Sequence, residues 1–256
     1  MSFLSLVGVE FKKLRRSKIS LIFIIPVFLI WGMAVTNADV NFNASPMGIS
    51  PENNFFIQSF LGFAWFMLPA SLVVITVLLT QTERANHGLI KMLSLPISGV
   101  KLCMAKYCVC VIIMTAEVLL MFAAYFPSAM IASARFNYEF MLDFKYVLEV
   151  CGAMVLVSLP MSAVYWMISV LLKNPVTSVG FGLATVVPVV LAINTKVWYA
   201  YPMCYPMMLI ASEMNKFAAD PEASAMGLVP WIPVAVILTI VSLVIACLQF
   251  GKSERK

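Results

Sequence analysis

The chain has 256 residues, of which 62% are hydrophobic and only 11% are Asp, Glu, Lys or Arg. A soluble domain of this length needs far more charged surface, so the composition excludes a soluble globular protein and indicates an integral membrane protein. The formal net charge of +5 fits contact with anionic lipid head groups and gives no reason to expect nucleic-acid binding.

Six apolar segments are long enough to cross a membrane. The hydrocarbon layer is about 30 Å thick and a helix rises about 1.5 Å per residue, so about 20 apolar residues span it. A helix satisfies its own backbone hydrogen bonds in lipid, so we predict an all-α integral membrane protein with a single transmembrane domain over residues 1–256. The predicted spans are residues 19–36, 55–80, 107–131, 146–172, 175–194 and 228–250.

Lysine and arginine are distributed unevenly between the two sides of these spans. Short loops rich in Lys and Arg stay in the cytoplasm. With the N-terminus inside, thirteen of the seventeen basic residues fall in inner segments, and the outer segments keep only Arg135, Lys145, Lys196 and Lys216. We therefore predict that both termini are cytoplasmic, together with residues 81–106.

The amino end, residues 1–18, has the pattern of an amphipathic helix lying in the inner membrane interface. Its apolar residues recur at helical spacing, namely Phe3, Leu6, Val7, Phe11 and Leu14. The alternative is an ordinary basic flank of the first span. For residues 19–36 the alternative is a signal peptide, but the apolar run is longer than is usual for one.

The stretch QTERANHGLIKMLSLPIS, residues 81–98, brings charged residues between the second and third spans. It contains a capping residue, an apolar stripe at i, i+3 and i+4, and a terminating proline, namely Asn86, Leu89, Met92, Leu93 and Pro96. A short amphipathic helix over residues 83–96 suits a groove on a cytoplasmic partner. The alternative is a solvated loop at the lipid head groups.

The third predicted span contains one carboxyl group, Glu117, ten residues from its start. A charge at that depth is costly, so the side chain should face other helices or water, and such residues are candidates for function. The structural alternative is a protonated or paired glutamate that holds helices together. A proton-driven carrier usually has several such groups, which this chain lacks.

The connection of residues 195–227 is unusually aromatic. Trp198, Tyr199, Tyr201 and Tyr205 gather beside two prolines. Aromatic residues favour the membrane interface, so we expect this outer connection to lie in or dip into the outer leaflet and to offer these four side chains to a substrate. An ordinary aromatic belt is the alternative.

Five of the six cysteines fall in or next to predicted spans, where they serve as small apolar packing residues. Cys204 alone is placed in an outer loop. No motif for enzymatic chemistry is present, since there is one histidine and no HExxH or GxSxG sequence. The fragment GKS at residues 251–253 resembles the end of a phosphate-binding loop, but Ala246 stands where that loop needs glycine. We expect no enzyme, no cofactor and no metal site in this chain.

The segment from Glu83 to Lys106, with ER, GLIKMLSLPIS and LCMAKY, resembles the one that joins the second and third spans of ABC-2 type permeases. In that family an acidic residue precedes a small-residue turn, a short coupling helix ends in a Leu-Pro pair, and a lysine follows at the next helix. The amino end, VEFKKLRRSK, resembles the interface helix that opens those permeases. The resemblance implies ATPase coupling through Glu83, Arg84, Asn86, Gly88, Leu89, Met92, Leu93 and Pro96.

The length, the lone permease and the polar first outer loop are most similar to lantibiotic immunity permeases. That resemblance implies a separate ABC ATPase dimer that binds ATP and Mg, a second related permease or a second copy of this chain, and the bacterial cytoplasmic membrane as the location. It also implies export of a cationic amphipathic peptide to the outside, and re-entrant helices in the last outer connection. Export of another amphipathic compound and a non-transporting scaffold or sensor are the other functions that the sequence leaves open.

Overall fold

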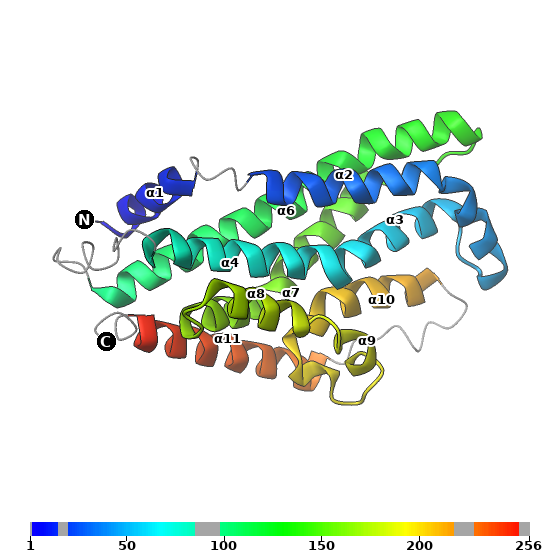
Figure 1. Cartoon of the computed structure of the whole chain (residues 1–256). Helices are drawn as coiled ribbons and strands as arrows, with labels where there is room; N and C mark the ends of the chain where they lie inside the picture. The colour runs from blue at the N-terminus through cyan, green and yellow to red at the C-terminus, as the bar shows by residue number, and fades with distance from the viewer. Residues whose placement is uncertain (1, 15–19, 85–97, 218–227, 251–256) are drawn as a thin grey trace.

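Every regular element of the described residues is a helix. The computed structural model describes residues 2–14, 20–84, 98–217 and 228–250 (Figure 1). Its α-helices are α1 (Phe3–Leu14), α2 (Ser20–Thr36), α3 (Pro51–Gly62), α4 (Leu68–Arg84), α6 (Gly99–Phe136), α7 (Phe144–Leu171), α8 (Pro175–Ala184), α9 (Val189–Ala192), α10 (Tyr205–Phe217) and α11 (Leu228–Phe250). Shorter elements are η1 (Ala38–Met47), the π-helical η2 (Phe63–Met67), η3 (Trp198–Ala200) and η4 (Pro202–Cys204). The predicted all-α membrane fold is confirmed.

Five stretches of the described chain are helical, long and apolar enough to cross a membrane. They are Pro51–Gln81, Gly99–Phe136, Phe144–Leu171, Pro175–Ala192 and Val229–Phe250. The remaining predicted span, residues 19–36, corresponds to α2, whose apolar part, Ile24–Thr36, is shorter. The chain is therefore a multi-pass membrane protein.

α6 is much longer than the span predicted for it. Its 38 residues extend over roughly 57 Å, nearly twice the hydrocarbon thickness. The helix begins early because the hydroxyl of Ser98 accepts a hydrogen bond from the backbone N–H of Lys101, 3.3 Å away. It ends at Asn137, which takes the left-handed conformation with φ 50°. Lys106, expected at the inner edge of the membrane, is thus inside a helix.

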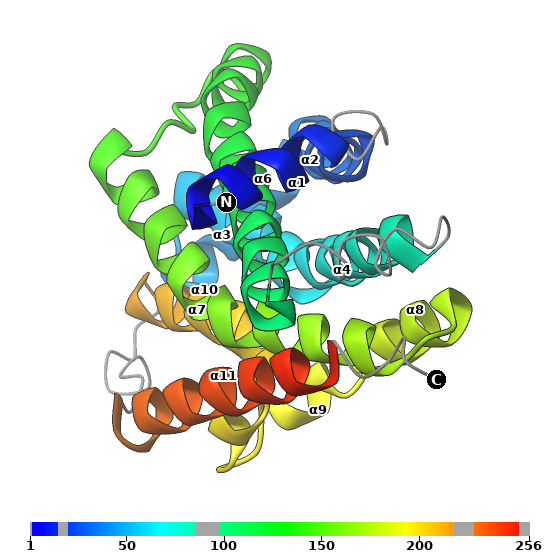
Figure 2. The ribbon, with the colours of Figure 1, turned by 90° about the vertical axis from the view of Figure 1, so that its left-hand side faces the viewer.

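The bundle has two ends that differ in what they carry. α1 lies at one end, together with the last turns of α4, α7 and α11, and we call this the α1 end (Figure 1). η1 and the link between α6 and α7 lie at the other, the η1 end. α6 packs against α1, α2, α4, α7 and α11, and Figure 2, seen from the α1 end, shows it between α2, α4 and α7.

The connection after α9 does not simply cross the surface. After η3 and η4, α10 packs against α3 and α7 within the bundle. Glu213 of α10 is buried; its carboxylate accepts a hydrogen bond from the hydroxyl of Tyr146 (3.2 Å) and pairs with Lys216 (2.5 Å). These contacts fix α10 beside α7 at the η1 end.

Candidate functional site

The predicted ATPase-docking segment leaves and rejoins the bundle at the α1 end. Glu83 and Arg84 form the end of α4, and the described chain resumes at Ser98. The amide of Gln81 donates a hydrogen bond to the carbonyl oxygen of Lys173 (3.2 Å), which joins α4 to the link between α7 and α8. The other predicted docking residues lie outside the described residues, namely Asn86, Gly88, Leu89, Met92, Leu93 and Pro96.

A buried ion pair connects α1 to α6 beside this segment. Nζ of Lys106 lies 2.6 Å from Oε2 of Glu10, and the two residues are 0% and 1% exposed. The same ammonium group lies 3.5 Å from the carbonyl oxygen of Leu79 in α4. The other carboxylate oxygen of Glu10 pairs with Lys13 at 2.8 Å. Three helices therefore meet at one pair of charges.

The ion pair between Glu10 and Lys106 lies on the face of α1 that is buried against the bundle. Leu6 and Glu10, four residues apart, share the face of α1 that is buried, whereas Phe3 and Phe11 are exposed. Glu10 can enter the core beside Leu6 because Lys106 supplies the counter-charge for its carboxylate. The exposed phenylalanines remain available to lipid.

Glu117 lies in the middle of α6 and is fully buried. The polar side chain near Glu117 is that of Ser71 in α4, which is also buried. Among the described residues, neither carboxyl oxygen of Glu117 has a partner within normal hydrogen-bond geometry. A polar group buried in this way costs free energy of folding. Ser71 is thus the polar group that faces Glu117, and both the structural role and a role in transport stay predictions.

The aromatic residues predicted to contact substrate form part of a larger cluster. The ring centroids of Trp198 and Tyr205 are 6.1 Å apart, and each ring also contacts Trp231 of α11, at 5.9 and 5.7 Å. The hydroxyl of Tyr205 donates to the carbonyl oxygen of Tyr199 at 2.5 Å. Trp231 was not predicted to belong to this cluster because it lies in the last predicted span. Contact between this cluster and a substrate stays a prediction.

Tyr201 and Cys204 pack inside the same connection. The hydroxyl of Tyr201 donates to the carbonyl oxygen of Thr185 at 2.5 Å. Cys204 is fully buried, with Sγ 3.8 Å from the carbonyl oxygen of Val189, and this burial raises the pKa of its thiol to about 12. Cys204 therefore lies in the connection predicted for it, but it is packed against α9 and not open to solvent, and its outer location stays a prediction.

An apolar groove of about 470 Å³ runs between α7 and α11, next to the aromatic cluster. Tyr205 and Trp231 line it, and the other lining side chains are apolar apart from one threonine. These are Leu156, Val157, Leu159, Pro160, Ile232, Ala235, Val236, Thr239 and Ile240. The groove can take an apolar chain and offers almost no polar contact.

Residues 6–191 match the family model described as ABC-2 family transporter protein, which covers most of the chain. The chain belongs to this family. No curated protein matches it. An ABC-2 permease is a membrane transport component that works with an ABC ATPase and is not itself the ATPase. Within the described part of this permease, no three His, Cys, Asp or Glu residues gather as metal ligands.

Some of the sites described above lie inside the range that matches the ABC-2 family model, and the aromatic cluster lies beyond it. It includes Glu10, Lys106 and Glu117 together with the docking segment, and it ends before Trp198. The family resemblance pointed to a lysine at the start of the third span, where Lys106 stands. Its partner Glu10 lies 96 residues earlier, and no local pattern links the two. The aromatic cluster is a feature of the part of the permease beyond the matched range.

Proposed function

We propose that this ABC-2 permease removes an amphipathic, lantibiotic-like peptide from the bacterial cytoplasmic membrane to the outside. The energy comes from ATP and Mg bound by a separate ABC ATPase dimer, which docks on residues 83–96 at the α1 end. A second related permease, or a second copy of this chain, completes the path. Both termini are then cytoplasmic, and the η1 end faces outward.

The observation that carries the proposal is the apolar groove between α7 and α11. Because it runs along two membrane-spanning helices, an apolar side chain can enter it from the hydrocarbon layer instead of from water. Tyr205 and Trp231 line the groove, and aromatic rings of this kind suit the border between lipid and water. A molecule that is apolar on one side and polar on the other fits this arrangement.

The charges at the η1 end favour a cationic substrate. In the described residues that end carries six acidic side chains, namely Asp39, Glu52, Glu139, Asp143, Glu149 and Glu213. Its basic side chains are Arg135, Lys145, Lys196 and Lys216. Glu213 is buried and paired with Lys216, so the exposed part of this end carries a small excess of acidic side chains, which attracts a cationic peptide leaving the membrane. An uncharged amphipathic compound would use the same groove without this attraction.

The test compares the tolerance of cells to a panel of lantibiotics. Cells that produce the chain, its partner permease and the ATPase should survive higher peptide concentrations than cells whose ATPase cannot hydrolyse ATP. Val236→Trp, which fills the groove, should reduce this protection, whereas Val244→Trp, on the same helix but outside the groove, should retain it. Equal tolerance with active and inactive ATPase across the panel contradicts the immunity role.

A further inference from the structure

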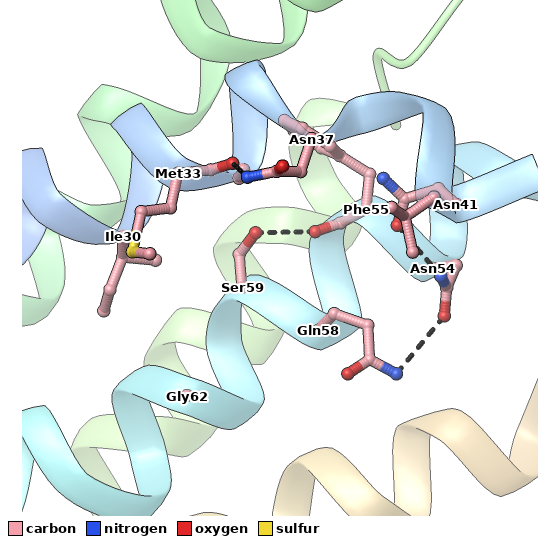
Figure 3. A pocket seen from close by; sticks show the side chains of 11 residues that line it. Ile30, Met33, Asn37, Asn41, Asn54, Phe55, Gln58, Ser59 and Gly62 are labelled. Atoms are coloured by element: carbon pink, nitrogen blue, oxygen red, sulfur yellow. Dashed lines mark hydrogen bonds between the residues drawn. The ribbon is translucent and has the colours of Figure 1, made fainter.

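A second cavity, unrelated to the groove between α7 and α11, lies at the η1 end. It occupies about 470 Å³ between the last turns of α2, η1 and the length of α3 from Asn54 to Gly62 (Figure 3). Its walls differ in character. α2 contributes mainly apolar side chains, such as Ile30 and Met33, whereas η1 and α3 contribute carboxamides.

The carboxamides form a connected row. Nδ2 of Asn54 donates to Oδ1 of Asn41 at 2.9 Å, and Nε2 of Gln58 donates to Oδ1 of Asn54 at 3.4 Å (Figure 3). Asn41 and Asn54 are each 7% exposed, and Nδ2 of Asn41 is held by the carbonyl oxygen of Ala38 at 3.0 Å. Buried amides bonded to one another in this way are fixed in orientation before any ligand arrives.

Two carboxamides lining the cavity keep a free acceptor oxygen, namely Gln58 at one end of the row and Asn37 outside the row. Gln58 lines the cavity, is exposed and uses its amino group toward Asn54. Asn37, on the opposite wall, donates to the carbonyl oxygen of Met33 at 2.9 Å. Among the described residues, no hydrogen bond reaches the side-chain oxygen of either residue. Two carboxamide oxygens are therefore available to accept hydrogen bonds from a molecule in the cavity.

The cavity lining contains no ionisable side chain. A charged head group would lose water here and find no counter-charge, which is costly. A hydroxyl or carboxamide group would instead exchange hydrogen bonds with the row of amides. We propose that this cavity binds the uncharged polar head of an amphipathic molecule, a head that both donates and accepts hydrogen bonds, with its apolar part against α2. The inference goes beyond the proposed export role and does not depend on it.

Gly62 provides a way to close the site without disturbing the fold. It lines the cavity, and a Cβ added there meets no atom within 4 Å. The Cβ of Gly62→Leu therefore falls in open space on the cavity side, and leucine favours a helix more than glycine does. Gly32 of α2 is the matched control, because its Cβ also meets nothing within 4 Å and it does not line the cavity.

The experiment uses the full-length chain in lipid nanodiscs. The probe is octyl glucoside with a photoreactive diazirine in its alkyl chain, and labelled residues are mapped by mass spectrometry. Competitors share the octyl tail: octyl glucoside, N-octanoylglycinamide, octyltrimethylammonium and octyl phosphate. We expect labelling within residues 30–62, displaced by both neutral competitors, with the charged ones needing about tenfold higher concentrations or more.

The variants decide between the cavity and the general lipid surface. Gly62→Leu should abolish the displaceable labelling while Gly32→Leu keeps it, and Gln58→Leu should weaken it several-fold because one acceptor is removed. Displacement by the charged competitors at the same concentrations as the neutral ones would overturn the proposal. So would labelling that Gly62→Leu leaves unchanged. The order of the two neutral competitors tells whether the site prefers sugar hydroxyls or peptide-like amides.

Discussion

Nζ of Lys106 and Oε2 of Glu10 lie 2.6 Å apart and buried, where the N-terminal helix α1 packs against α6, the longest membrane-spanning helix. Both residues are almost fully buried, so water does not screen the interaction. Since α6 follows the predicted docking segment, movement of that segment is expected to reach α1 through this pair.

Removing one member of the pair should destabilise the protein strongly. Glu10→Leu removes the carboxylate that lies 2.6 Å from the buried ammonium group of Lys106, which should cost about 3–5 kcal/mol. The double variant Glu10→Leu with Lys106→Leu should recover most of this loss, because an apolar pair of similar size needs no counter-charge. The measurement is the thermal denaturation midpoint in detergent, with Lys12→Gln on the exposed side of α1 as control. Equal loss in the single and double variants would contradict an ionic role.

Replacement of Glu117, unlike replacement of Glu10, should not lower the stability of the protein. Its carboxyl oxygens have no hydrogen-bond partner among the described residues, so Glu117→Met should leave thermal stability unchanged or raise it by about 1–3 kcal/mol. If the carboxyl group serves transport, the same variant should abolish protection against the exported peptide at unchanged expression. A variant that is less stable yet fully protective would show that Glu117 has only a structural role.

The packing of α8 on α4 depends on one glycine. A Cβ at Gly182 would lie 2.7 Å from Cγ1 of Val73, and the short valine side chain cannot swing away. Gly182→Ala should therefore lower stability by about 1–3 kcal/mol, and adding Val73→Ala should restore part of it. Thermal denaturation of the two variants, beside Gly180→Ala, whose Cβ meets nothing within 4 Å, tests this contact. No difference between Gly182→Ala and Gly180→Ala would exclude close packing at this point.

The helices could be predicted from the sequence because the length of an apolar run is a local property. Their ends were less predictable. α6 extends to Gly99 through the cap at Ser98, and a charged residue such as Lys106 gave no reason to continue an apolar span. The burial of Lys106 depends on Glu10, which lies far away in the sequence, and only the packing of α1 on α6 brings the two together.

For the candidate sites too, local clusters could be predicted from the sequence, whereas contacts that depend on packing could not. Trp198, Tyr199, Tyr201 and Tyr205 stand out as a local cluster, but the structure adds Trp231 from α11 and bonds the hydroxyls of Tyr201 and Tyr205 to backbone carbonyl oxygens. The carboxamide row of the further cavity was visible only as a polar first outer loop. Its members come from η1 and α3, and their mutual hydrogen bonds depend on how these two elements fold against each other.

The orientation of the bundle can be tested with introduced cysteines. Native Cys204 is unsuitable because it is buried. Lys145→Cys at the η1 end and Lys12→Cys at the α1 end both replace exposed side chains. A membrane-impermeant maleimide should label Lys145→Cys in intact cells and Lys12→Cys only after lysis. The reverse pattern would place the α1 end outside.

Docking of the ATPase on residues 83–96 is the central claim, and co-purification of the ATPase with permease variants tests it most directly. Leu89, Met92 and Leu93 lie outside the described residues, but their spacing predicts a stripe that enters a groove on the ATPase. A charge in Leu93→Asp would be buried unpaired or would push the segment out, whereas Lys91→Gln, off the stripe, should weaken docking by no more than about 1 kcal/mol. At matched permease levels, we predict that Leu93→Asp loses the ATPase and Lys91→Gln retains it. Equal retention by both variants would contradict docking through this segment.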